Sequence, residues 1–557
     1  MEQVRLIIAI VLSVAVFLAW DYFFLPDTPP PQPPQQAAQS PAAARGQEQE
    51  TASREVSGQP GPAPAPALET APVPAPGAPA RTLKVQTPLY DAELSTRGAA
   101  ITRLTLMKYR ASPEEDAPFY EMISLPTGEG SLAAGFAGGS VGPLATGTWE
   151  LSSPAGDVVR LDHAPQNVVF TYSTDQGVTV EKTYTFRPDS YLVGVSVRVA
   201  NGSGLPVNDR LFLDVKNRLG KPKRVVFQGP LALVNGSVVE VDANDAAKKG
   251  HLSGDVDWAG ITGRYFLSAV APDTEGPADV RMSTSEDGML RTRFLYPQEP
   301  VPPGAEKTFY AEAFFGPKST AALKQAGHQL PRALHFGWFD FLAKPLLWLM
   351  NVMHRFIPNY GVAIILLTIL VKLLFWPLSN KSYQSMAAMK KLAPLMQEIR
   401  EKYKDDKKKM NEEVFALYRT FKVNPLSGCL PMIVQIPVFI ALYKMLYEAI
   451  ELRHAPFLLW INDLSAPDRL FRFDFSIPFM EAPYGIPVLT LLMGASMFIQ
   501  QKMTPSPGDP SQAKMMMFLP ILFTFIFINF PSGLVLYWLV NNILSMAQQY
   551  YIQKKAA

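Results

Sequence analysis

The chain has 557 residues, a formal net charge of +2 and one cysteine, Cys429. This length allows several domains, the near-neutral charge gives no general attraction to nucleic acid, and a single cysteine excludes internal disulfide bonds. Apolar residues make up 48% of the chain, and they are concentrated in long runs that are typical of membrane-spanning helices.

The N-terminal segment starts with an apolar run, LIIAIVLSVAVFLAW at residues 6–20, which continues into aromatic residues. A cleaved signal peptide and a retained membrane anchor both fit this run. Because the aromatic residues resemble an interfacial belt and no small-residue cleavage site follows, residues 1–25 are predicted to be a retained anchor. Residues 26–82 are rich in proline and alanine and are predicted to be a disordered tether, since they lack the apolar side chains of a core.

Short runs of alternating apolar and polar residues dominate residues 83–330. In the segment YLVGVSVRVANGSG, residues 191–204, valines alternate with glycine, serine and arginine before turn residues end the run. Such runs predict a large antiparallel β-sandwich, and the segment is long enough to hold its own core.

Residues 331–360 are predicted to contain an amphipathic helix that lies in the membrane interface. The run at residues 338–357 is aromatic and apolar, but charged residues interrupt it too often for a bilayer span. The remaining residues, 361–557, are predicted to form a five-helix membrane core. Its expected spans are residues 361–378, 429–447, 485–501, 515–530 and 533–550, which make six spans together with the N-terminal anchor.

The basic residues predict the orientation of these spans. Residues 379–424 carry eleven lysines and arginines, whereas residues 453–484, in a later connection, carry three. Basic residues close to span ends stay in the cytoplasm. Residues 379–424 are therefore predicted to be a cytoplasmic pair of helices joined at residues 404–409. With six spans, both termini are cytoplasmic and the β-sandwich is periplasmic.

One lysine, Lys372, lies inside the apolar span 361–378. A lysine at the centre of a spanning helix costs roughly 2.5–3.5 kcal/mol on insertion scales. None of the five spans of the core has an aspartate or glutamate within its apolar part, so no intramembrane counter-ion is expected. Lys372 either extends its side chain to the cytoplasmic end of the helix or faces a hydrated cavity, and the sequence leaves both open.

Several other polar residues accompany Lys372 in the spans. Thr368 lies one helical turn before it, on the same face, and Gln435 lies within the next span. Such residues commonly form hydrogen bonds between helices; together with a lysine, they also fit the lining of a groove open to the cytoplasm. In the last span Trp538, Asn542 and Ser545 are predicted to share one helix face, with Tyr537 and Asn541 beside it.

The sequence contains no metal-binding motif, phosphate-binding loop or nucleophile elbow, and its six histidines are scattered without ligand spacing. We therefore expect no cofactor, no metal and no enzymatic reaction.

Three segments carry a resemblance to a known family. They are NPLSGCLPMIVQIPVFIALY (424–443), LWINDLSAPD (459–468) and FPSGLVLYW (530–538), which Asn541 follows. They resemble the signatures of YidC-type membrane protein insertases. The order of anchor, tether, large β-domain and five further helices is similar to the Gram-negative form of that family.

The resemblance implies a β-supersandwich and a membrane protein insertase and chaperone in the bacterial inner membrane. Its implied partners are nascent membrane proteins, the Sec translocon with its accessory subunits, membrane lipids, and the ribosome, which would bind residues 379–424 and the C-terminal tail. No nucleic-acid substrate is implied. The insertase would work alone or with the translocon.

The resemblance also implies a substrate-contacting groove. Lys372 stands where the family usually has an arginine, so the charge is kept while the planar fork of a guanidinium is lost. Thr368, Gln435, Tyr537 and Trp538 match family positions in or beside the groove, and Asn541 and Asn542 are expected with them. The external segment 469–484 is longer than the usual family pattern.

Two other classes of protein remain as alternatives. A secondary transporter predicts intramembrane acidic residues or an internal repeat, and neither is visible. A periplasmic sugar-binding or sensor protein on a membrane base would lose all function on deletion of residues 83–317, whereas an insertase core would keep much of its activity.

Overall fold

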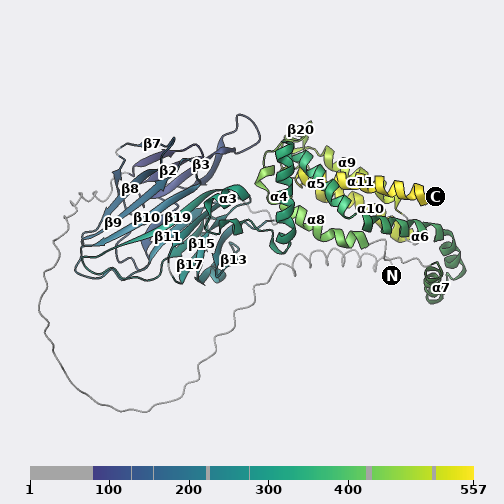
Figure 1. Cartoon of the computed structure of the whole chain (residues 1–557), viewed down its shortest axis with the longest axis horizontal. Helices are drawn as coiled ribbons and strands as arrows, with labels where there is room; N and C mark the ends of the chain where they lie inside the picture. The colour runs from purple at the N-terminus through teal and green to yellow at the C-terminus, as the bar shows by residue number, and fades with distance from the viewer. Residues whose placement is uncertain are drawn as a thin grey trace, which may run out of the picture. The chain divides into compact units, whose positions relative to one another are not determined.

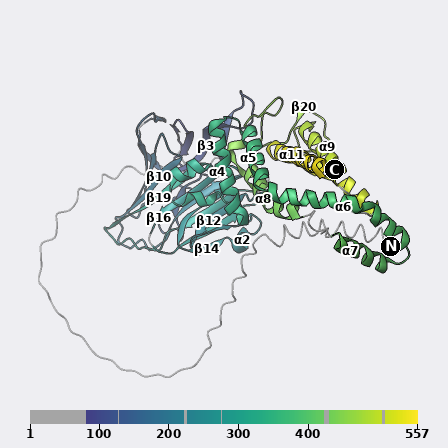
Figure 2. The same ribbon diagram turned by 45° about the vertical axis from the view of Figure 1, so that its right-hand side comes forward.

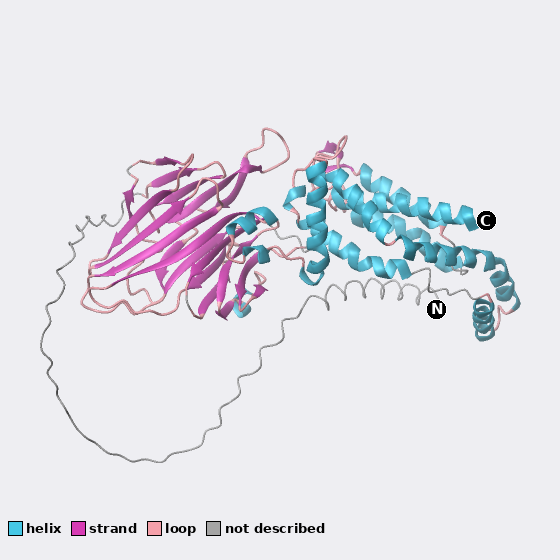
Figure 3. Cartoon of the chain, in the orientation of Figure 1, coloured by secondary structure: helices cyan, strands magenta, loops and turns pink. Residues whose placement is uncertain are grey.

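The computed structural model describes residues 80–556 except 127, 155, 221–225, 275, 422–429 and 505–509. The predicted anchor, residues 1–25, and the tether up to residue 79 lie outside the described residues, so both stay predictions. All described strands except two fall between residues 82 and 317, and the long helices fall between residues 340 and 556 (Figure 3).

The β-domain is built from three sheets. The first has the order β4–β3–β2–β1–β7: β1 (Thr82–Gln86), β2 (Tyr90–Ser95), β3 (Ala100–Arg110), β4 (Phe119–Ser124) and β7 (Val158–Arg160). The third has the order β14–β17–β18–β11–β5: β5 (Ala133–Phe136), β11 (Leu211–Asn217), β14 (His251–Gly254), β17 (Ala278–Thr284) and β18 (Leu290–Leu295).

The second and largest sheet has nine strands in the order β13–β12–β15–β16–β19–β10–β9–β8–β6 (Figure 1). They are β6 (Glu150–Ser153), β8 (Gln166–Ser173), β9 (Val178–Phe186), β10 (Leu192–Asn201), β12 (Gly229–Val234), β13 (Ser237–Glu240), β15 (Val256–Thr262), β16 (Phe266–Asp273) and β19 (Glu306–Pro317).

Alternation explains how these strands pack. In β9, VTVEKTYTF, every second residue is buried, as expected for a strand with one face on the core. Strand β11, LFLDVKN, is buried along its whole length because it is covered on both faces. The core of the domain contains several fully buried aromatic residues, among them Trp149, Phe170 and Phe294.

The expected antiparallel sandwich is corrected at one edge, where one pair of strands is parallel. Strand β7 pairs with β1 in parallel, with Val158 opposite Lys84. A parallel pair needs a long connection between its strands, and the chain between β1 and β7 supplies one. Alternation reports which residues face the core but not the direction of a neighbouring strand, so the sequence does not reveal this pair.

Short helices follow the sheets. They are α2 (Ala246–Lys249), α3 (Thr320–Ala326), and the 3-10 helices η1 (Leu330–Ala333) and η2 (Gly337–Phe339). Helix α4 (Asp340–Phe356) comes next. It buries Leu347 and Met350 on one side and exposes Phe341 and Trp348 on another, so it has apolar residues both toward its neighbours and toward its surroundings.

After α4, the regular elements of the described residues are helices apart from one small hairpin. Its elements are α5 (Tyr360–Leu374), α6 (Trp376–Lys402), α7 (Lys407–Thr420), α8 (Leu430–Glu448), η4 (Ile450–Leu452), β20 (Leu470–Phe473), β21 (Tyr484–Ile486), α9 (Val488–Met503), α10 (Pro510–Phe527) and α11 (Ser532–Ala556).

The predicted span 361–378 is corrected by the structure, because α5 ends at Leu374 and α6 starts at Trp376 with a bend of 65° between them. Pro377 lies in the first turn of α6. A proline there has no N–H to continue the hydrogen bonds of the preceding helix, and its fixed φ suits the start of a new one.

No single helix in the described part of the chain is both long and apolar enough to cross a membrane on its own. Helix α5 and the first part of α6, Trp376–Met389, meet that requirement only as a bent pair, and Met515–Phe527 is a shorter apolar stretch.

Candidate functional site

The polar residues singled out from the sequence lie on three helices. Thr368 and Lys372 are on α5, Gln435 is on α8, and the segment from Tyr537 to Asn542 is on α11. The three helices belong to the helical part of the chain (Figures 1 and 2). Helix α11 contacts both α5 and α8, so it can bring the residues of all three helices together.

Lys372 is held between α5 and α11. Its side chain is 8% exposed, and its ammonium donates a hydrogen bond of 2.6 Å to Ser545 Oγ. The Ser545 hydroxyl in turn donates to the backbone carbonyl of Asn541 at 2.7 Å. The hydroxyl of Tyr383, on α6, is also hydrogen-bonded to Ser545.

No carboxylate in the described ranges forms an ion pair with Lys372. The ammonium is bonded to α11, close to the C-terminal end of α5. This contact fits both alternatives for the lysine, so extension to the helix end and exposure to a hydrated cavity both stay predictions.

Gln435 joins the same set from α8. Its side-chain amide donates to Asn541 Oδ1 at 3.1 Å, and Tyr537, which is 3% exposed, is hydrogen-bonded to Gln435. Lys372, Ser545, Asn541 and Gln435 are thus linked across three helices, through both the backbone carbonyl and the side chain of Asn541, and we call these four residues the polar row.

Three of the expected residues make their contacts outside the polar row. Thr368 is buried and donates to the carbonyl of Ile364, within its own helix, at 2.6 Å. Asn542 donates to Ser496 on α9 at 3.0 Å. The ring of Trp538 packs edge-on against aromatic rings of two other helices, Phe439 at 4.6 Å and Phe527 at 4.8 Å.

Trp538, Asn542 and Ser545, which are predicted to share one helix face, have partners on different helices. Helix α11 is packed against several helices at once, so residues that share one broad face still meet different neighbours. The sequence predicts Ser545 on the same face as Asn542 but not as a site residue. No pattern in the sequence points to Tyr383, because its contact with Ser545 depends on the bend between α5 and α6.

The helices also expose large apolar side chains. Leu491 and Leu492 on α9 are 52% and 49% exposed, and Phe525 and Ile526 on α10 are 60% and 46% exposed. Apolar surface of this extent requires a non-aqueous neighbour, which a lipid bilayer provides.

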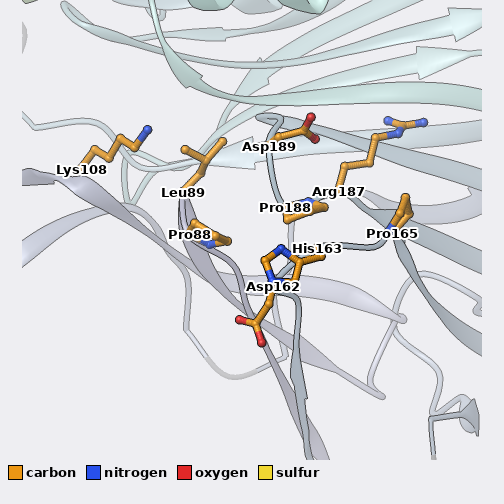
Figure 4. A pocket seen from close by; sticks show the side chains of 9 residues that line it. All are labelled: Pro88, Leu89, Lys108, Asp162, His163, Pro165, Arg187, Pro188 and Asp189. Atoms are coloured by element: carbon orange, nitrogen blue, oxygen red, sulfur yellow. The ribbon is translucent and has the colours of Figure 1, made fainter.

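The β-domain contains an open cavity of about 620 Å³ (Figure 4). Three of its nine lining residues are prolines, and none is a phenylalanine, tyrosine or tryptophan. The guanidinium of Arg187, one of the charged lining residues, is already engaged by both carboxylate oxygens of Glu312, at 2.9 and 3.0 Å. Ligand pockets are mostly apolar and aromatic with a few free polar groups, so this cavity does not favour a sugar-binding function.

Comparison with known proteins assigns the two halves separately. Residues 82–349 match the family model described as YidC periplasmic domain, and residues 352–557 match the one described as 60Kd inner membrane protein. The chain is therefore an inner-membrane protein with a periplasmic domain.

Relatives cover the whole chain. The membrane protein insertase YidC of Syntrophobacter fumaroxidans is 40% identical over 569 residues, covering 99% of this chain and 100% of the relative. The protein of the same name from Pelobacter propionicus is 40% identical over 557 residues and covers 99% of each. Both are named as insertases and not as enzymes.

Solved structures are more distant. A crystal structure of an active YidC insertase with its first transmembrane domain resolved is 18% identical, with a TM-score of 0.37, and covers 85% of this chain and 95% of that one. A galactose mutarotase related enzyme from Lactobacillus acidophilus is 8% identical, with a TM-score of 0.29, over 42% of this chain and 97% of its own.

The two family models and the full-length relatives agree with each other. The chain belongs to the YidC family of membrane protein insertases.

Proposed function

We propose that this protein inserts inner-membrane proteins into the bilayer and assists their folding, and that the polar row is its substrate-contacting site. The observation that carries the proposal is Lys372, a buried cation on an apolar helix whose partner is a hydroxyl rather than a carboxylate. A cation without a carboxylate partner is available to an acidic group that arrives with a substrate.

The proposed mechanism lowers the barrier that a polar segment meets in the membrane. A groove that admits water from the cytoplasm shortens the apolar path for the substrate's polar tail, because a charge in hydrocarbon is costly. Lys372 attracts acidic residues of that tail and exchanges Ser545 for a carboxylate. Gln435 and Asn541 replace water around the tail, Thr368 and Asn542 support the surrounding helices, and Tyr537 and Trp538 contact the apolar helix as it moves into lipid.

The arrangement in the membrane is part of the same proposal. Residues 1–25 are an anchor, residues 26–82 a tether, residues 83–330 the periplasmic sandwich and residues 331–360 an interfacial helix. The core, residues 361–557, supplies five spans, with both termini and the helices of residues 379–424 in the cytoplasm. The basic residues of that segment support this orientation.

Partners beyond the substrate follow from family membership and charge. Helices α6 and α7 and the C-terminal tail would bind the ribosome through their basic residues. The Sec translocon would cooperate in the insertion of substrates that need it.

Charge substitutions at Lys372 test the proposal. Lys372→Arg keeps the charge and should preserve insertion of a substrate with an acidic tail, whereas Lys372→Leu should impair it and Lys372→Glu should impair it more. Insertion is measured in proteoliposomes without translocon, as protease protection of the tail. The matched control is Lys502→Glu, the same charge change at an exposed position near the end of α9, which should leave insertion unchanged.

Two outcomes would contradict the proposed role of Lys372. One is normal insertion of the acidic-tailed substrate by the Lys372→Glu protein at normal abundance. The other is an equal loss for substrates whose tails have been neutralised, because an electrostatic attraction requires acidic groups in the tail.

A further inference from the structure

The connection between α8 and α9 exposes several large apolar side chains. In and around the β20–β21 hairpin, Phe471 is 70% exposed, Phe475 is 64% exposed and Phe479 is 85% exposed. These three phenylalanines, which we call the hairpin phenylalanines, belong to the segment 469–484. In water such exposure is unfavourable, so it needs an explanation.

Two of the hairpin phenylalanines are also held in a strained backbone conformation. Phe471 has φ of +51° and Phe479 has φ of +64°. Bulky L-residues rarely adopt this left-handed region, and such outliers persist only where the surrounding structure enforces them. The conformation that presents these rings outward is therefore imposed on the chain.

Arg469 supplies much of that enforcement. Its guanidinium donates to the carbonyls of Pro483 at 2.9 Å and Ile528 at 2.8 Å and to Asn529 Oδ1 at 3.2 Å. These bonds join the two ends of the hairpin to the turn between α10 and α11.

Asn529 completes the clamp from the other side. Its side-chain oxygen accepts from the backbone N–H of Glu481, and its amide donates to the carbonyl of Phe479, both at 2.8 Å. The base of the hairpin is thus fixed to the helices while its aromatic side chains stay exposed.

The hairpin lies at the helix ends near α4. Asn359, which caps the start of α5 directly after α4, donates to the carbonyl of Phe457 in the same connection at 3.0 Å. Asp468, just before β20, accepts from the backbone N–H of Leu489 in the first turn of α9. The exposed residues Leu491 and Leu492 lie near the start of α9, directly after the hairpin. Exposed apolar residues also lie near the end of α10, next to the turn that Asn529 belongs to.

We propose that the β20–β21 hairpin is a membrane-interface anchor, whose hairpin phenylalanines enter the lipid leaflet at the α4 end of the helices. That leaflet is the outer one in the orientation proposed above. The occupant is lipid because the phenylalanines continue the apolar faces of helices in an inner-membrane protein. Aromatic side chains favour the interfacial region, where their apolar rings leave water. The inference does not rest on the role of Lys372.

A single fluorescent label tests where the rings lie. Because the chain has one cysteine, Cys429→Ser gives a background in which Phe479→Cys and, separately, Phe475→Cys carry an NBD fluorophore. The full-length protein is reconstituted into vesicles of phosphatidylethanolamine and phosphatidylglycerol, with or without lipids that bear a nitroxide quencher on the headgroup or along the acyl chain. Glu286→Cys, at an exposed turn of the β-domain, is the control for a label in water.

The expected result is a blue-shifted emission for both hairpin labels and at least twofold stronger quenching by the nitroxide lipids than for the Glu286→Cys label. Equal quenching of hairpin and control labels would overturn the proposal. A blue-shifted label that iodide and nitroxide lipids both fail to quench would also overturn it, because the rings would then be covered by protein. Wild-type circular dichroism in each labelled protein shows that the fold is kept, and Phe475 has no left-handed backbone whose strain a substitution would change.

Discussion

Lys372 and Ser545 show how a single lysine is accommodated between apolar helices. The ammonium has one hydroxyl partner on α11, and that hydroxyl is itself tied to the backbone of its own helix. A hydrogen bond to a charged group contributes about 1.5–3 kcal/mol, and leaving the charge unpaired costs more. The contact between α5 and α11 should therefore depend on both residues jointly.

A double-mutant cycle measures this dependence. Lys372→Met, Ser545→Ala and the double variant should show a coupling of about 1–3 kcal/mol in the free energy of unfolding in detergent. Thr368→Val combined with Ser545→Ala is the matched control and should be additive, because Thr368 bonds within its own helix. Additive effects of Lys372→Met and Ser545→Ala would show that their hydrogen bond contributes nothing measurable.

A second lysine, Lys182, is fully buried in the β-domain. Its ammonium donates to the carbonyl of Ala99 at 2.9 Å and to that of Leu132. Burial lowers the pKa of Lys182 to about 7, against the opposing effect of the Asp214 carboxylate. In the unfolded chain the pKa of Lys182 returns to the ordinary value of 10.5. Between about pH 7 and this value, Lys182 therefore carries a proton in the unfolded chain but not in the folded one.

Lys182 therefore predicts a pH dependence. Below about pH 7 Lys182 is protonated in both the folded and the unfolded protein, so it does not change the pH dependence of stability. Above about pH 7 the free energy of unfolding rises by about 1.4 kcal/mol per pH unit. Relative to Lys182→Met, the wild-type protein should gain about 2–3 kcal/mol between about pH 7 and pH 9. The measurement is denaturant unfolding followed by the β-sheet circular dichroism signal. Parallel stabilities of the two proteins over this range would contradict the prediction.

Among the elements, α6 and α7 occupy the segment that carries most of the basic residues of the core. Asp406 caps α7 by accepting from the backbone N–H groups of Lys408 and Lys409 at 3.1 and 3.0 Å. A capped helix of this composition has little apolar surface to bury, which agrees with a position in water rather than in lipid.

The orientation of α6 and α7 is tested by cysteine labelling in the Cys429→Ser background. Asp405→Cys lies just before the cap of α7 and should react with an impermeant maleimide only after the spheroplast membrane is opened. Glu286→Cys, in the β-domain, should react in intact spheroplasts. Reversal of the two patterns would invert the proposed topology.

For the whole molecule, the β-domain has an extensive apolar core of its own between its sheets. The polar row lies entirely on α5, α8 and α11. Because the proposed site draws no side chain from the β-domain, insertion should depend little on that domain.

Deletion of residues 83–317 should therefore preserve most of the insertion of an acidic-tailed substrate, measured per molecule of protein in the membrane. The same deletion combined with Lys372→Glu should abolish it. Complete loss of insertion at normal abundance in the deletion alone would indicate that the β-domain takes part in the reaction.

The sequence by itself determined the elements whose cause is local. The alternation in residues 191–201 predicts strand β10, and the apolar runs after residue 360 predict α5, α8, α9, α10 and α11 to within a few residues at most ends. Apolar residues repeat every 2.0 residues in a strand and every 3.6 residues in a helix because one face is buried. This repeat is visible within a single strand or helix. The family signatures likewise lie in contiguous segments.

Tertiary structure decided which strands pair and which side chains contact each other. The parallel pairing of β7 with β1 and the separate partners of Asn541 and Asn542 depend on how elements are placed and rotated against each other. Helical spacing puts Asn541 and Asn542 about 100° apart, but only the positions of α8 and α9 decide that one meets Gln435 and the other Ser496. Lys372 was recognisable from its cost in an apolar helix, whereas Ser545, which satisfies it, lies 173 residues away in the chain, where no local pattern connects the two.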